Sequence, residues 1–121
     1  MSATKINLTI EKGATYYKSF IWRDKTKTPI SISGLSARMQ IRASLNSTSF
    51  ETELTTGTGE IVLEAGSETG RVDITIGATV TDALTIDIGV YDLELYDPAD
   101  PDNVTRLVEG IVSVVEGVTR W

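Results

Sequence analysis

The sequence contains no cysteine and no histidine. Without cysteine there is no disulfide, no thiolate nucleophile and no zinc–thiolate site. Without histidine, the chain lacks the side chain that most often serves as a general base or as a ligand for a transition metal. An enzyme is therefore the least expected class of protein, and we predict no catalytic residue, no cofactor and no bound metal.

Positive charge and long apolar runs are also scarce. The chain has 11 lysines and arginines against 17 aspartates and glutamates, which gives a net charge of −6. Binding to nucleic acid depends on basic side chains that neutralise phosphates, so we expect no nucleic-acid partner. No apolar run approaches the ~20 residues of a membrane-spanning helix. The N-terminal sequence also lacks the charged-then-apolar pattern of a signal peptide, and we expect no membrane partner.

What the sequence does contain is a regular alternation of apolar and polar residues, the period of a half-buried β-strand. At 121 residues, of which 40% are hydrophobic, the chain suits a single domain spanning residues 1–121. Strand-like runs recur about every ten residues with turn signals between them, which predicts an all-β sandwich or barrel. Only residues 78–84 have a helical pattern, with Thr79 or Thr81 as the candidate N-cap. The strand-like runs are residues 5–11, 15–23, 30–32, 37–42, 50–54, 61–63, 72–76 and 91–96.

Residues 89–115 form the segment on which we expect the other strands to be layered. Apolar residues alternate with polar ones over residues 91–95, and the turn at 97–103 contains two prolines and four Asp or Asn residues. The chain then returns through residues 104–115, which are rich in β-branched side chains. We predict a long antiparallel hairpin with a β-bulge at Gly110, where the apolar positions change register.

The run at 15–23 carries the largest apolar side chains of the chain. Tyr16, Phe20 and Trp22 fall on one face of this strand, and Tyr17 falls on the other. Phe20 and Trp22 are therefore expected to anchor the core, with Trp22 largely buried.

Two groups of acidic residues are candidate sites. The turn from Asp97 to Asn103 offers the oxygen ligands that calcium prefers, but it lacks the spacing of an EF-hand loop. The alternative is a solvated hairpin turn, which we predict. Asp92 and Glu94 share one face of a strand, as paired catalytic carboxylates would. The alternative, which we favour, is ion pairing across the sheet with Arg106 or with lysines.

Several segments resemble a family of small structural proteins of tailed bacteriophages. The similar segments read GATYYKSFIWRD, PISISGLSARMQIRAS, TGRVDITI and GVYDLELYDPADPDNVTRLVEGIVSVVEGVTR. Members of this family are usually encoded among tail, baseplate or fibre genes, and similar segments occur at the N-termini of baseplate upper proteins. The resemblance covers residues 13–120 and brings no family active site with it. The expected fold is all-β, an immunoglobulin-like antiparallel β-sandwich with one short helix.

The resemblance implies a virion protein that acts in particle assembly through protein–protein contacts. The expected partners are other virion proteins and copies of the same chain, at the tail, baseplate or fibre attachment. One alternative is a capsid decoration or cement protein. Another is a carbohydrate-binding module, which would require a coplanar exposed pair of aromatic residues among Tyr16, Tyr17, Tyr96 and Trp121. The candidate contact residues are Ile6, Leu8, Ile10, Tyr17, Tyr96 and Trp121.

Overall fold

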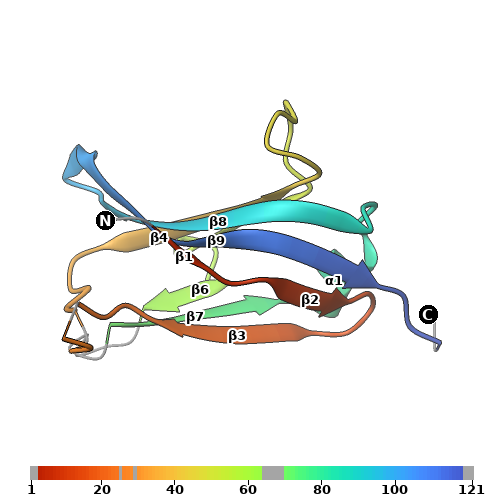
Figure 1. The fold of residues 1–121 in the computed structure, drawn as a ribbon, viewed down its shortest axis with the longest axis horizontal. Helices are drawn as coiled ribbons and strands as arrows, with labels where there is room; N and C mark the ends of the chain where they lie inside the picture. The colour runs from red at the N-terminus through yellow and green to blue at the C-terminus, as the bar shows by residue number, and fades with distance from the viewer. Residues whose placement is uncertain (1–2, 25, 29, 64–69, 119–121) are drawn as a thin grey trace.

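Two β-sheets pack face to face in the computed structural model, which describes residues 3–24, 26–28, 30–63 and 70–118 (Figure 1). The larger sheet has the strand order β1-β9-β8-β4-β5, with β2 also paired to β9, and the smaller sheet has the order β3-β7-β6. The elements are β1 (Thr4–Lys5), β2 (Leu8–Glu11), β3 (Tyr16–Ile21), β4 (Ser36–Arg42), β5 (Thr52–Thr55), β6 (Ile61–Leu63), β7 (Arg71–Ile76), α1 (Ala78–Asp82), β8 (Ile88–Asp97) and β9 (Asp100–Val115).

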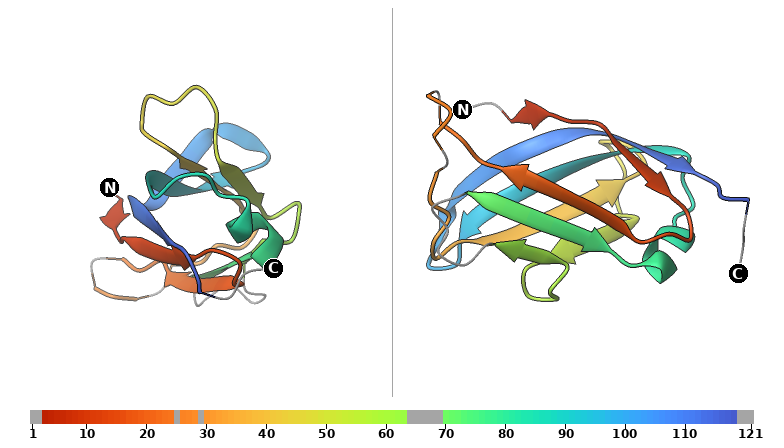
Figure 2. Two further views of the ribbon diagram at one scale, coloured as in Figure 1. Left: turned by 90° about the vertical axis from the view of Figure 1, so that its right-hand side faces the viewer. Right: turned by 90° about the horizontal axis from the view of Figure 1, so that it is seen from below.

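This strand order is that of an immunoglobulin-like β-sandwich, so the predicted fold class is confirmed. Most strand pairs are antiparallel, and β8 with β9 forms the long hairpin expected from the sequence. The exceptions lie at the N-terminal edge, where β1 and β2 both run parallel to β9. The two layers and this edge can be followed in Figure 2.

The core lies between the sheets, and most strands contribute alternate side chains to it, as β2 and β4 do. Phe20 is buried in it, as predicted. Trp22 lies one residue beyond the end of β3 and packs, partly buried, against the rim of the core, so it is less enclosed than Phe20. The largest fully buried side chains include Ile10, Ile32, Met39, Ile41, Leu54, Ile61, Ile74, Ile76, Leu93 and Leu95.

The first strands belong to the sandwich of their own subunit. Leu8 is 2% exposed and Ile10 is fully buried, and both pack into the core. Ile6 is half-buried and packs against the same core. Our expectation that Leu8 and Ile10 contact a partner is therefore corrected, because the core of the same chain already covers them. Ile6 keeps a partly exposed surface.

The single short helix is present but is capped differently from the prediction. Its N-cap is Gly77, and no side chain caps the first turn. Thr81 lies within the helix and is buried. Its Oγ1 donates a hydrogen bond to the Ala14 carbonyl at 2.9 Å and accepts one from the Gly13 N–H at 3.1 Å. Thr81 thus fastens the helix to the β2–β3 turn.

The β-bulge of the long hairpin lies at Leu107 and not at Gly110. The residues on either side of Leu107 pair with consecutive residues of β8, so Leu107 is the extra residue. Leu107 and Val108 are both buried as a result. The structure does contain the change of apolar register that the sequence indicates, but the change begins at Leu107, three residues before Gly110.

Gly110 is instead a point of close approach between two strands. A Cβ atom at this position would collide with the carbonyl oxygen of Ile6. That carbonyl accepts a hydrogen bond of 2.6 Å from the Tyr91 hydroxyl. The side-chain oxygen of Asn7 accepts a hydrogen bond of 3.0 Å from the N–H of Ile111. Between β1 and β2, the side chains of Tyr91 and Asn7 therefore make two hydrogen bonds to backbone groups that would pair with backbone in a regular sheet.

Candidate functional site

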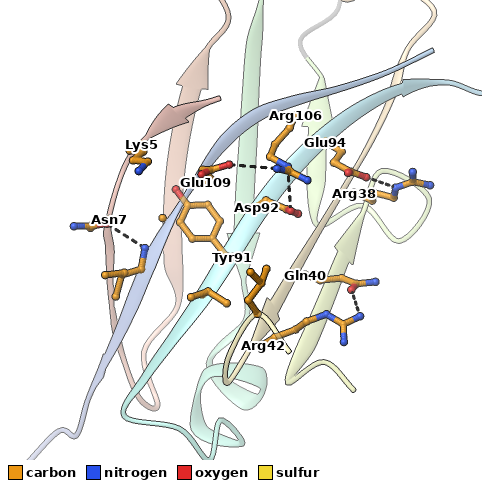
Figure 3. Close-up of a pocket in the computed structure, with 14 residues that line it drawn as sticks. Lys5, Asn7, Arg38, Gln40, Arg42, Tyr91, Asp92, Glu94, Arg106 and Glu109 are labelled. Atoms are coloured by element: carbon orange, nitrogen blue, oxygen red, sulfur yellow. Dashed lines mark hydrogen bonds and ion pairs between the residues drawn. The ribbon is translucent and has the colours of Figure 1, made fainter. Parts of the chain in front are cut away.

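The outer face of the large sheet, which points away from the small sheet, is hollowed into a groove of about 810 Å³ that we call the outer groove. Side chains of β4, β8 and β9 form its floor (Figure 3). The β4–β5 connection and the tip of the β8–β9 hairpin both rise on this side of the sheet (Figure 2).

One half of the outer groove is an ordered network of ion pairs. Arg38 Nε lies 2.9 Å from Glu94 Oε1, and Arg106 Nε lies 3.4 Å from Asp92 Oδ2. Arg106 also reaches Glu109, with its Nη1 3.5 Å from Oε1. Asp92 and Glu94 are therefore cross-strand ion-pair partners, as we favoured, although the partner of Glu94 is Arg38. These pairs are partly exposed, so each contributes little stability alone.

Asp92 is a partly buried carboxylate of this network, and its surroundings disfavour the charged form. Its pKa is raised above the usual range, first because burial disfavours the charged form and then because Glu94 repels it. Arg106 opposes part of this rise, and Glu109 adds to it. The arrangement holds charges in fixed positions, which suits recognition of a partner surface.

A second chain of hydrogen bonds holds the β4–β5 connection against the sheet. Arg42 donates from Nη1 to the Ser47 carbonyl at 2.9 Å and from Nη2 to Gln40 Oε1 at 2.7 Å. Gln40 Nε2 in turn donates to Glu53 Oε2 at 2.6 Å. The wall of the outer groove is thus fastened to its floor by polar bonds that span β4 and β5.

The other half of the outer groove is apolar. Val90 and Ile111 are direct neighbours across the β8–β9 ladder, and Leu45 reaches the groove from the β4–β5 connection. Ile111 is 46% exposed, and Ile88, further along the same outer face, is 66% exposed. We missed this surface in the sequence. The signal was an isoleucine or valine at outward positions of β8 and β9, out of phase with the buried residues.

The predicted contact residues are not brought together. Tyr17 lies on the outer face of the small sheet, where its hydroxyl accepts a hydrogen bond from Arg71 at 3.2 Å. Tyr96 lies on the outer face of the large sheet beneath Arg38, whose guanidinium carbon is 4.5 Å from the ring centre. Trp121 falls outside the described residues. Tyr17 and Tyr96 therefore do not form the coplanar pair that a carbohydrate-binding module would need.

The acidic turn uses its carboxylates to stabilise itself. Asp97 Oδ1 accepts a hydrogen bond from the Ala99 N–H at 2.9 Å, and Asp100 Oδ1 accepts one from the Asp102 N–H at 3.2 Å. Such bonds are typical of Asx turns. Over residues 3–24, 26–28, 30–63 and 70–118, no group of three or more acidic side chains converges as a metal site would require.

Comparison of the sequence with known proteins identifies no family. No protein-family model and no curated protein sequence matches the chain. Among the described residues, no helix has the length and apolar character needed to cross a membrane.

Solved structures do resemble it. One is named "Tim-1", with 11% identity, full coverage of both chains and a TM-score of 0.47. Another is the extracellular domain of the voltage-gated sodium channel β4 subunit, described as a parallel homodimer with a role in cell–cell adhesion. It has 10% identity, covers 98% of this chain and 97% of its own, and has a TM-score of 0.48. The chain is an immunoglobulin-like β-sandwich, as its strand order establishes.

Proposed function

We propose that this chain is a structural protein of a tailed-bacteriophage virion and acts in particle assembly through protein–protein contacts. The resemblance of residues 13–120 to phage tail and baseplate proteins motivates the virion role. The observation that carries the contact role is the outer groove, where exposed apolar side chains adjoin an ordered network of charges. An apolar centre beside polar groups is the usual composition of a protein interface.

The outer groove suits a protein partner better than a small substrate. It lies on a sheet face whose arginines and carboxylates already pair with one another. A partner surface can adopt these fixed charges as hydrogen-bond partners while it covers Ile111 and Leu45. Because virions present many copies of each component, even a modest interface gains strength from avidity.

The test is a substitution in the apolar half of the outer groove. Ile111→Arg places a charge in the proposed contact without entering the core, because this side chain is 46% exposed. We expect incorporation into particles to fall about tenfold or more, as for central interface residues, while the melting temperature stays close to that of the wild type. Incorporation is measured by quantitative mass spectrometry of purified particles.

The matched control is Val62→Arg, at a side chain of similar exposure (50%) on the small sheet. We expect this variant to incorporate normally. If Ile111→Arg also assembles fully, the outer groove is not the contact. Cryo-EM of the same particles then separates the proposed tail location from the alternative of a capsid decoration protein.

A further inference from the structure

A second, smaller cavity opens on another side of the sandwich, where β3 and β1 form the edges of the two sheets. Its volume is about 410 Å³, and we call it the edge pocket. In the described part of the chain, β3 pairs only with β7, so its other edge is free. The apolar wall of the edge pocket is formed by Ile6, Phe20, Trp22, Leu107 and Val108.

The charges that line the edge pocket are all positive. Lys18 and Arg23 both line it, and no ion pair joins either one to a carboxylate of the described residues. Arg106 also lines it, but its guanidinium is paired with Asp92 in the outer groove. Although the net charge of the chain is −6, the described residues that line this apolar cavity include two cations without an ion-pair partner and no acidic side chain.

Trp22 gives an independent indication that this pocket receives a partner. Its Nε1 is buried, and it has no hydrogen-bond acceptor among the described residues. Buried N–H groups in folded proteins are almost always paired, and an unpaired one costs free energy. Trp22 lines the edge pocket, so a partner that enters it and shifts the indole can bring an oxygen acceptor to this N–H. The unpaired donor and the two cations would all bind a partner that carries oxygen acceptors and negative charge.

The tip of the β8–β9 hairpin has the complementary chemistry. Between Asp97 and Asn103 it carries three aspartates and no basic residue. Residues 98–104 are exposed, and the tip stands clear of the two sheets (Figure 1). It also presents Val104, which is 39% exposed and can cover the apolar wall of a pocket. No other described segment combines this acidity with this projection.

We propose that the edge pocket of one copy receives the acidic hairpin tip of a second copy, an inference that rests on the proposed role in assembly. Side chains rather than backbone make this contact. Lys18 lies on the inward face of the free edge strand, and a charge in that position discourages the addition of another strand. Its ammonium group instead attracts the aspartates of the tip. Because every copy has one tip and one pocket, the contact closes a pair or continues along an array.

The experiment uses two charge-reversal variants of the full chain. The pocket variant is Lys18→Glu with Arg23→Glu. The tip variant is Asp102→Lys with Asn103→Lys, which leaves the turn bonds accepted by Asp97 and Asp100 in place. Both variants are first compared with the wild type by circular dichroism and thermal melting, so that a failure to fold is recognised. Self-association is then measured by sedimentation velocity at low ionic strength.

The wild type is expected to associate reversibly, and more weakly as salt screens the charges. Each variant alone should associate at least about tenfold more weakly, because the pocket variant sets glutamates against an acidic tip and the tip variant has lost the net negative charge of its tip. When the two variants are mixed, the acidic tip of the pocket variant meets the unchanged basic pocket of the tip variant, and association should return. In an NMR spectrum of the wild type, the indole N–H signal of Trp22 should shift with concentration, and Trp121→Phe identifies which indole signal is which.

A wild type that stays monomeric throughout, or variants that fail to associate when mixed, would overturn this inference. The proposed function can fail separately. If mixing restores association but neither the pocket variant nor Ile111→Arg reduces incorporation into particles, self-association stands and the assembly role does not. If the wild type is monomeric but Ile111→Arg abolishes incorporation, the assembly role stands and the tip contact does not.

Discussion

At the scale of single residues, Gly110 shows how one missing side chain permits a strand crossing. The backbone of Ile6 passes directly over this glycine, and the Tyr91 hydroxyl fixes the Ile6 carbonyl from the other side. The Ile6 backbone therefore cannot move away to make room for a Cβ atom without breaking this partly buried hydrogen bond. Burial also raises the pKa of the Tyr91 hydroxyl, which keeps it neutral and able to donate.

Gly110→Ala is expected to destabilise the fold by roughly 1–3 kcal/mol, the range for forcing extra atoms into a packed site. The free energy of unfolding is measured by urea denaturation. Gly57→Ala is the control, because a Cβ atom there would meet only the Thr55 hydroxyl at 3.7 Å. We expect a change within about 0.5 kcal/mol for the control. Equal effects of the two substitutions would show that the close approach is not a constraint.

Asp92 gives a prediction about pH. Its pKa is raised in the folded state by burial and by Glu94, so the folded chain holds this proton more tightly than the unfolded chain. The resulting stability is fully present below the ordinary carboxyl pKa of 3.8 and is lost as the pH rises through the folded-state value. The variant Asp92→Asn has no ionisable group at this position, so it does not lose stability in this way as the pH rises. The melting temperature of the variant relative to the wild type is therefore expected to rise from pH 3 to pH 7.

Asp24 provides a control of opposite sign. Hydrogen bonds from the Thr26 side chain and the Thr28 N–H lower the pKa of Asp24 below its ordinary value. Its contribution is present above the unfolded-state pKa and is lost as the pH falls through the folded value. For Asp24→Asn, the relative melting temperature should therefore fall between pH 3 and pH 7. If both variants follow the same trend, the environment of Asp92 has been assigned wrongly.

At the scale of elements, β2 is the strand whose role changed most between sequence and structure. Its alternation of apolar and polar residues predicted a strand, and the strand is there. The sequence could not show which sheet edge it joins, because its partner β9 lies about a hundred residues away and supplies no local pattern. Leu8 and Ile10 therefore looked available for a partner, while in the structure they complete the core.

Leu8→Ala is expected to cost about 2–5 kcal/mol, since it leaves a cavity between the sheets. Thr9→Ala, at the exposed neighbour on the same strand, should change stability by less than about 0.5 kcal/mol. Both are measured by urea denaturation. A deletion of residues 1–11 should likewise abolish cooperative unfolding. A truncated chain that melts normally would contradict the placement of β2 in the core.

The bulge and the helix cap show a second limit of local reasoning. The apolar pattern around Leu107 correctly indicated a change of register. The sequence prediction placed the bulge at Gly110 because glycine is common at β-bulges, whereas the extra residue is Leu107. In the helix, Thr81 has the side chain of a capping residue but serves as a tertiary bond to Ala14. The partner of Thr81 lies 67 residues away in the sequence, and the place of the bulge depends on the register between β8 and β9.

At the scale of the whole molecule, strand spacing and turn signals alone predicted an all-β sandwich or barrel. The outer groove did not, because it requires the order in which β4, β8 and β9 lie side by side. The pairing of Arg38 with Glu94 depends on that order, since 56 residues separate them. Outward-facing isoleucines could have indicated an exposed apolar surface, but only once the inward face of each strand had been fixed.

The parallel pairing of β1 and β2 with β9 has a mechanical consequence. The first and last strands of the described chain run side by side in the same direction and share one register from Thr4 to Glu11. Tension applied to the two ends therefore pulls these strands lengthwise past each other. Their hydrogen bonds are loaded together and cannot be opened one by one, so forced unfolding has to cross the barrier for breaking the whole ladder at once. Single-molecule stretching should show one abrupt rupture, the behaviour of a domain that transmits force without extending.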